Sequence, residues 1–254
     1  MDSLNDHVFK LGYVCVAAVV SLFGTMGNLI MICALVFLQE NKVPRNAFLV
    51  SLALADFIVS SVTIPNSITG AVLGKRHFKD HSKTCALMAT LCGPACLSSI
   101  FSMCWISVSR YYYICDFPNY SRHFTNGKIS IYIASIWILS FMIQLPNHLG
   151  WGDVKFSDSW YFCTVDTDTP SYGMFFGGWI NVAVIITFIY YWKMFKRLRA
   201  SSVSKHAASR YNLSADDERL LSDGKLIRTS FKVFLTFVVP ANVRGQTRFD
   251  QTSA

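Results

Sequence analysis

Charged residues are scarce in this chain, and long stretches contain none of them. Of its 254 residues 15% are Asp, Glu, Lys or Arg and 52% are hydrophobic, whereas an ordinary soluble domain has about 25% charged residues. Four stretches carry no charge and a fifth carries only Asp56: 11–38, 84–109, 129–152 and 169–192, and then 46–74. A helix needs roughly 20 apolar residues to cross a bilayer. Five such stretches in succession favour membrane-spanning helices over the buried helices of a soluble protein.

The sequence also lacks the motifs of enzymes and metal proteins. No Ser-His-Asp set, His-Glu-x-x-His, Cys-x-x-Cys or glycine-rich phosphate loop stands out, and the six histidines have no metal-binding spacing. We therefore expect neither an enzyme nor a metal site. The net charge of +8 comes mainly from Lys and Arg near the predicted inner helix ends. This distribution predicts an outer N-terminus and an inner surface that faces anionic lipid, and it gives no reason to expect nucleic acid as a partner.

The apolar stretches predict an all-α fold, a transmembrane helix bundle with five complete helices and a partial sixth. The helices are expected at 11–38, 46–73, 84–115, 128–149 and 171–198, followed by a shorter apolar segment at 226–240. We divide the chain into an extracellular N-terminus at 1–10, a membrane domain at 11–240 and a polar tail at 241–254. The tail is too polar to continue a membrane helix.

Two features inside this frame suggest chemistry. Asp56 lies in the middle of the second helix, where a carboxylate is costly and usually marks an ion or proton site; the alternative is a protonated Asp bonded to a neighbouring helix. Asn28 in the first helix is its expected partner. Cys85 and Cys163 are the cysteines placed in outer segments, where a disulfide can form, although two free thiols remain an alternative.

Several motifs occur together in an order that resembles the rhodopsin-like G-protein-coupled receptors. They are Gly27-Asn28, Leu52-Ala53-Leu54-Ala55-Asp56, Pro65, Cys85, Ser109-Arg110-Tyr111, Trp137 and Cys163. The interval from Cys85 to Arg110 resembles the family's third helix, which runs from the disulfide cysteine to the arginine of the Asp/Glu-Arg-Tyr motif. The resemblance covers about residues 11–239 and implies a seven-helix receptor architecture.

Within the family the chain most resembles the melatonin receptors, through Arg110-Tyr111-Tyr112-Tyr113-Ile114-Cys115, Leu145-Pro146-Asn147 and Cys163-Thr164. The resemblance implies a ligand site under the long outer loop, with these residues: Cys92, Gly93, Cys96, Asn147, Val165, Phe175 and Trp179. Asn147 stands where melatonin receptors place a ligand-binding asparagine, but Val165 and Trp179 replace their phenylalanine and histidine. Cys92 stands where amine receptors keep the Asp that pairs with the ligand, so a cationic monoamine lacks its counter-ion.

The resemblance also implies an inner coupling site and a polar core. The residues of the coupling and switch site are Ser109, Arg110, Tyr111, Tyr191 and Asp223. Ser109 replaces the acidic residue that usually restrains Arg110, and Asp223 is a candidate for that role. Asn28, Asp56 and Ser99 resemble the family's sodium pocket, so no cofactor is expected apart from a sodium ion near Asp56.

We therefore expect a receptor that passes an extracellular small-molecule or peptide signal to heterotrimeric G proteins. It is expected at the plasma membrane as a multi-pass protein. The family's Cys-Trp-x-Pro and Asn-Pro-x-x-Tyr motifs do not follow Val239, so the chain is interpreted as truncated within the sixth helix and unable to signal. For this truncated form, retention in the endoplasmic reticulum is the alternative to the plasma membrane. One alternative is a five-helix protein that dimerises with full-length receptors and modulates them; another is a small transporter or channel that uses Asp56.

Overall fold

The computed structural model describes residues 2–38, 46–80, 82–152, 154–157, 161–165 and 170–207. Asp223, the predicted partial sixth helix at 226–240 and the tail at 241–254 lie outside these residues. The described residues form two compact units, each treated by itself below: 2–106 with 121–183, and 107–120 with 184–207.

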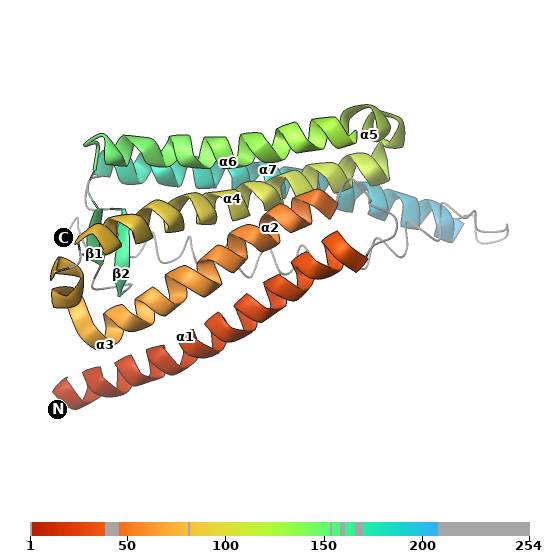
Figure 1. The fold of residues 1–254 in the computed structure, drawn as a ribbon. Helices are drawn as coiled ribbons and strands as arrows, with labels where there is room; N and C mark the ends of the chain where they lie inside the picture. Colours follow the sequence, from red (N-terminus) through yellow and green to blue (C-terminus); the bar gives the residue numbers. More distant parts are fainter. Residues whose placement is uncertain are drawn as a thin grey trace. The chain divides into compact units, whose positions relative to one another are not determined.

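Helices account for almost all of the described chain (Figure 1). In order they are α1 (Asp2–Cys33), α2 (Asn46–Ile58), α3 (Ile64–Asp80), α4 (Ser82–Cys115), α5 (Phe117–His123), α6 (Asn126–His148) and α7 (Pro170–Ala207). A π-helical turn η1 (Ala34–Leu38) ends α1, and a second, η2 (Val59–Thr63), joins α2 to α3. A π turn widens the helix by one residue and leaves a backbone carbonyl available to other groups.

Five of the described helical segments are long and apolar enough to cross a membrane: His7–Phe37, Asn46–Phe78, Lys83–Cys115, Asn126–His148 and Ser171–Arg197. Large apolar side chains project outward from them; Phe23 is 71% exposed and Phe37 is 77% exposed. Such a surface suits lipid rather than water. The predicted all-α class and the five spanning helices are confirmed.

The connections differ from the sequence prediction. The helix predicted from residue 11 begins at Asp2, and the inner loop predicted at 116–127 contains α5. The outer loop predicted at 150–170 contains an antiparallel hairpin of β1 (Val154–Ser157) and β2 (Phe162–Val165). Strands of four residues are too short to give a clear alternating pattern, so the sequence did not reveal them.

Helix α1 packs on the η2 turn through small residues. The Ser21 hydroxyl donates to the carbonyl oxygen of Ser60 at 2.8 Å. A Cβ atom added at Gly24 would lie 2.9 Å from the Ser60 Cβ, so only glycine permits this approach without a shift. The π turn therefore supplies the acceptor, and the glycine supplies the space, that fix α1 against the second helix.

The end of α6 turns the chain back over its own last turn. The amide of Trp151 donates to the carbonyl of Pro146 at 3.0 Å, and Gly150 between them has a φ of 97°. This six-to-one hydrogen bond with a left-handed glycine is the common C-terminal stop of helices. It places the next glycine, Gly152, against the side chain of Asn147.

Candidate functional site

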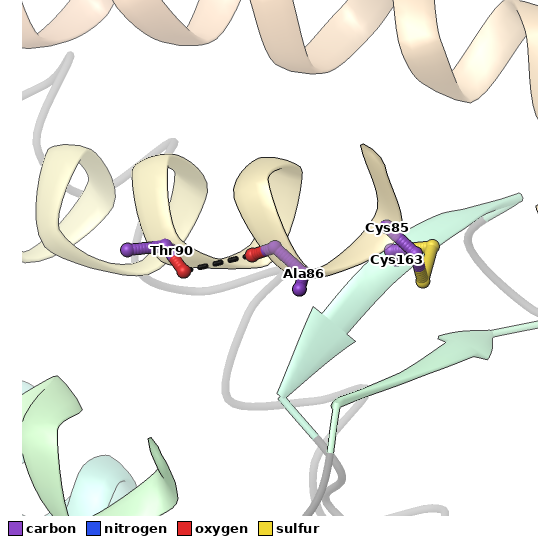
Figure 2. Close-up of a disulfide and its surroundings, with 4 residues drawn as sticks. All are labelled: Cys85, Ala86, Thr90 and Cys163. Atoms are coloured by element: carbon purple, nitrogen blue, oxygen red, sulfur yellow. Dashed lines mark hydrogen bonds between the residues drawn. A yellow bond between two sulfur atoms is a disulfide. The ribbon is translucent and has the colours of Figure 1, made fainter. Parts of the chain in front are cut away.

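The hairpin of β1 and β2 is linked to the start of α4 by the predicted disulfide between Cys85 and Cys163 (Figure 2). The Cα atoms of the two cysteines are 5.2 Å apart. Both cysteines are buried in an apolar cluster with Phe78, and Phe156 of β1 stacks on Phe78 with ring centroids 5.2 Å apart. The prediction of this disulfide is confirmed. Apolar packing and a covalent link therefore hold the hairpin over this end of α4.

Asp56 is bound by one partner of the predicted sodium pocket. The Ser99 hydroxyl of α4 donates to the Asp56 carboxylate at 2.7 Å. Asn28, the expected partner from α1, instead donates its amide to the carbonyl of Gly24 in its own helix at 2.9 Å. Carboxylate and hydroxyl oxygens are ligands that a small cation accepts. A sodium ion at Asp56 stays a prediction.

A three-helix hydrogen-bonded junction, which we call the Ser51 junction, is centred on Ser51, which precedes Asp56 on α2. The indole N–H of Trp137 on α6 donates to the Ser51 hydroxyl of α2 at 3.2 Å, and the Ser51 and Ser102 hydroxyl oxygens are 3.0 Å apart. Sequence analysis singled out Trp137 only as a family landmark and missed the two serines. The same helices carry other polar residues, such as Asp56 and Ser99, so residue type alone did not mark these two serines.

The predicted ligand residues lie on four elements of the fold: α4, α6, β2 and α7. Cys92 and Cys96, one turn apart on α4, are free cysteines, and Cys92 is buried. Phe175 of α7 packs against Trp151, with ring centroids 5.2 Å apart.

Trp179 and Val165 were also predicted to contact the ligand. Trp179 is partly buried on α7. Val165 ends strand β2, and its side chain is outside the described part of the structure. The structure places Gly93 against Gln144, which is buried on α6 as Asn147 is.

Asn147 lies on the buried face of α6 beside Gln144, a residue that sequence analysis did not select. Gln144 is 1% exposed and Asn147 is 4% exposed. Neither side-chain amide has a hydrogen-bond partner among the described residues. Gly93 of α4 approaches Gln144 so closely that a Cβ there would collide with the Gln144 amide oxygen. A glutamine three residues before Asn147, and thus on the same helix face, was the available signal.

Four of the five predicted switch residues, Ser109, Arg110, Tyr111 and Tyr191, lie in the second compact unit. Tyr191 and Met194 of α7 are buried against three residues of α4, Tyr111, Ile114 and Cys115. Lys193 lies over the rings of Tyr111 and Tyr190, at 5.9 and 5.5 Å from their centroids.

The residues before Tyr111 sit at the same end of α4. Ser109 is 2% exposed, and its hydroxyl has no partner among the described residues. Arg110 is partly buried. Asp223, the predicted partner of Arg110, lies outside the described residues. The structure brings Tyr111 and Tyr191 together, and their role in coupling stays a prediction.

Comparison with known proteins gives a family match and several relatives. Residues 27–243 match the family described as 7 transmembrane receptor (rhodopsin family). The chain is 32% identical to an octopamine receptor of Heliothis virescens over 143 residues. The matched region covers 55% of this chain and 30% of that receptor. It is 34% identical over 133 residues to an alpha-2 adrenergic receptor of Carassius auratus, 52% of this chain and 30% of the relative. A particular closeness to melatonin receptors stays a prediction.

The matched regions cover about a third of the length of these relatives. An alpha-2 adrenergic receptor of Labrus ossifagus matches over 157 residues, at 31% identity, which is 61% of this chain and 36% of that receptor.

Proposed function

Because the chain belongs to the rhodopsin family of seven-transmembrane receptors, we propose that it receives an extracellular signal and passes it to a heterotrimeric G protein. The observation that carries this proposal is the family match over residues 27–243. Membership of this receptor family also confirms that the chain is not an enzyme and that it is a multi-pass membrane protein. The outer N-terminus and the location in the plasma membrane are part of the proposal.

The residue at the centre of the predicted ligand site favours an uncharged ligand. Cys92, at the position that holds an aspartate in amine receptors, contributes a buried thiol in place of a carboxylate. An ammonium ion buried there would lack a counter-charge, which is strongly unfavourable in a membrane interior. We therefore favour an uncharged, melatonin-like ligand over the amine that the name of the octopamine receptor implies.

The inner end supports coupling through Arg110. The packing of Tyr191 and Met194 against Tyr111 links the helix that carries Arg110 to the inner part of α7. A ligand that favours one arrangement of these packed helices over another would change which groups face the G protein. Tyr111 and Tyr191 are then the residues through which a shift of α7 reaches Arg110.

A nucleotide-exchange experiment tests the coupling. The full chain, in lipid nanodiscs with a purified heterotrimeric G protein, should accelerate binding of GTPγS above the rate with empty nanodiscs. Arg110→Ala should return the rate to that of empty nanodiscs. Arg122→Ala, which removes an exposed arginine of α5, is the matched control and should behave like the unmodified chain.

Two results would overturn this proposal. The first is exchange no faster than with empty nanodiscs, which would favour a non-signalling partner of full-length receptors. The second is equal exchange by the Arg110→Ala variant and the unmodified chain, because coupling would then not depend on Arg110.

A further inference from the structure

The C-terminal part of α7 carries a group of exposed basic side chains. They are Lys193, Lys196, Arg197 and Arg199. The membrane-spanning segment of this helix ends at Arg197, so the cations lie where the helix leaves the apolar layer. The described helix, residues 170–207, contains no Asp or Glu. A group of cations without a negative charge on the same helix favours an anionic partner at the membrane surface.

Three of these cations share one face of the helix. Lys193, Lys196 and Arg197 are three and four residues apart, and residues with these spacings are neighbours on a helix surface. Four residues of helix rise about 6 Å, so the three cations are within reach of one headgroup. Arg199 follows Lys196 by three residues and extends the group by one more charge.

Aromatic rings hold two of the ammonium groups. The Lys193 Nζ lies 5.9 Å from the ring centroid of Tyr111 and 5.5 Å from that of Tyr190. The Lys196 Nζ lies 5.5 Å from the ring centroid of Trp192. Each ring attracts one side of an ammonium group, and N–H donors on the other side remain for phosphate oxygens. Because these side chains are already placed, they lose less conformational entropy when they bind a headgroup.

Large apolar side chains lie among the cations and just before them. Trp192 is 48% exposed and Phe195 is 45% exposed. The ring of Phe188 stacks on Trp192, with ring centroids 6.1 Å apart. Tryptophan is enriched where a spanning helix meets the headgroups. Exposed rings beside cations suit a ligand that has acyl chains below its anionic group, whereas a soluble anion would use the cations alone.

The number of cations indicates which anionic lipid fits. Phosphatidylserine has a single net negative charge, whereas a phosphate monoester carries about −1.5 to −2 near neutral pH. An inositol lipid with two phosphate monoesters therefore brings about three to four negative charges to one headgroup. That charge matches the four cations of α7. Clusters of Lys and Arg directly after a spanning helix are typical of sites for such lipids.

We propose that Lys193, Lys196 and Arg197 bind the headgroup of an inositol lipid with two phosphate monoesters, and that its acyl chains pack on Trp192 and Phe195. The proposal rests on the proposed function in one respect, since the outer N-terminus places this end of α7 in the inner leaflet. It goes beyond that function by naming a lipid partner and the residues that bind it.

Native mass spectrometry of the purified full chain, released from neutral detergent micelles, counts bound lipid molecules directly. Phosphatidylinositol bisphosphate should bind as one tightly held molecule per chain. Phosphatidylserine should bind at least tenfold more weakly because its headgroup has less charge. Inositol trisphosphate should also bind at least tenfold more weakly, because it has no acyl chains for Trp192 and Phe195.

Three results of this titration would overturn the proposal. Absence of binding by phosphatidylinositol bisphosphate would favour an acidic protein surface as the partner of these cations. Equal binding by phosphatidylserine would show attraction to any anionic lipid. Equal binding by inositol trisphosphate would show that the site takes a soluble phosphate compound instead of a lipid.

Paired substitutions locate the site. Lys193→Gln with Lys196→Gln should lower the affinity for phosphatidylinositol bisphosphate about 25-fold, because each cation near an anionic headgroup contributes about fivefold. Lys193→Arg with Lys196→Arg keeps both charges and should retain the affinity. Arg122→Gln with Lys128→Gln is the matched control. It removes two exposed cations from α5 and α6 and should leave the affinity unchanged.

The variants also have outcomes that contradict the site. An equal fall in the two glutamine pairs would show attraction to the overall charge of the chain. Unchanged affinity after loss of Lys193 and Lys196 would place the headgroup elsewhere. A fall in the arginine pair as large as in its glutamine counterpart would show that charge does not carry the binding. Because the assay needs no G protein, its failure together with intact nucleotide exchange leaves the receptor function standing.

Discussion

Replacing Ser51 with alanine removes the central hydroxyl of the Ser51 junction. Its oxygen accepts from the Trp137 indole at 3.2 Å, and its hydroxyl shares a second hydrogen bond with the Ser102 hydroxyl, whose oxygen is 3.0 Å away. Ser51 is therefore in two interhelical hydrogen bonds, whereas Trp137 and Ser102 are each in one of them. Loss of Ser51 should break both.

The size of the effect follows from measured bonds of this kind. Hydrogen bonds between membrane helices contribute on average about 0.6 kcal/mol and at most about 1.7 kcal/mol. Trp137→Phe and Ser102→Ala should each lower the free energy of unfolding by about 0.6 kcal/mol from the lost bond. Ser51→Ala should lower it by about 1.2 kcal/mol, the sum of both bonds. For a chain of this length that corresponds to a fall of about 2–5 °C in the unfolding midpoint.

Thermal unfolding of the purified chain in detergent micelles, followed by circular dichroism, measures these changes. A double-mutant cycle between Ser51→Ala and Trp137→Phe should give a coupling energy of about 0.6 kcal/mol, because the second change finds the shared bond already broken. Ser135→Ala is the control, since this exposed hydroxyl donates to the carbonyl of Tyr132 in its own helix. A coupling energy near zero, or a Ser51→Ala effect no larger than that of Ser135→Ala, would refute the assignment of Ser51 as the centre.

Three further predictions concern the disulfide, the ion site and the topology. Replacing Cys85 and Cys163 together by serine should lower the unfolding midpoint and remove its sensitivity to dithiothreitol. In the chain-entropy model, a cross-link over 78 residues contributes at most about 4.5 kcal/mol to the free energy of unfolding. An unchanged midpoint would contradict a stabilising role of the disulfide. Sodium chloride should raise the midpoint relative to choline chloride, and Asp56→Asn should abolish the difference; an equal response of both proteins would exclude a sodium site at Asp56. Asn119, in the sequence Asn-Tyr-Ser, should remain free of glycan when the chain is made in microsomes, and a mobility shift reversed by glycosidase would contradict an outer N-terminus.

Long-range patterns were predictable from the sequence where a single physical constraint acts on many residues. Each spanning helix follows from the bilayer's thickness, which demands about 20 apolar residues whatever their partners. The pairing of Cys85 with Cys163 was predicted because both fall in outer segments, where thiols can oxidise, and the structure confirms it.

Local partners were harder to predict because they depend on the rotation of each helix about its axis. Asn28 was expected to meet Asp56, yet its amide donates to Gly24 in its own helix, and Ser99 donates to Asp56. A rotation of a few tens of degrees decides between such partners. Nothing in the spacing of apolar residues fixes it so finely, since several faces of each helix are apolar.

The scarcity of charge and the five long apolar stretches by themselves determined the all-α membrane class, because bilayer thickness constrains it directly. The ordered motifs pointed to the receptor family by resemblance. The tertiary structure alone decided that Ser51 joins three helices, that a hairpin covers the end of α4, and that Gln144 shares a buried face with Asn147. These features depend on which helix faces meet. Apolar composition specifies that the faces are buried, and only the packing of small residues such as Gly24 and Gly93 specifies which side chains meet across them.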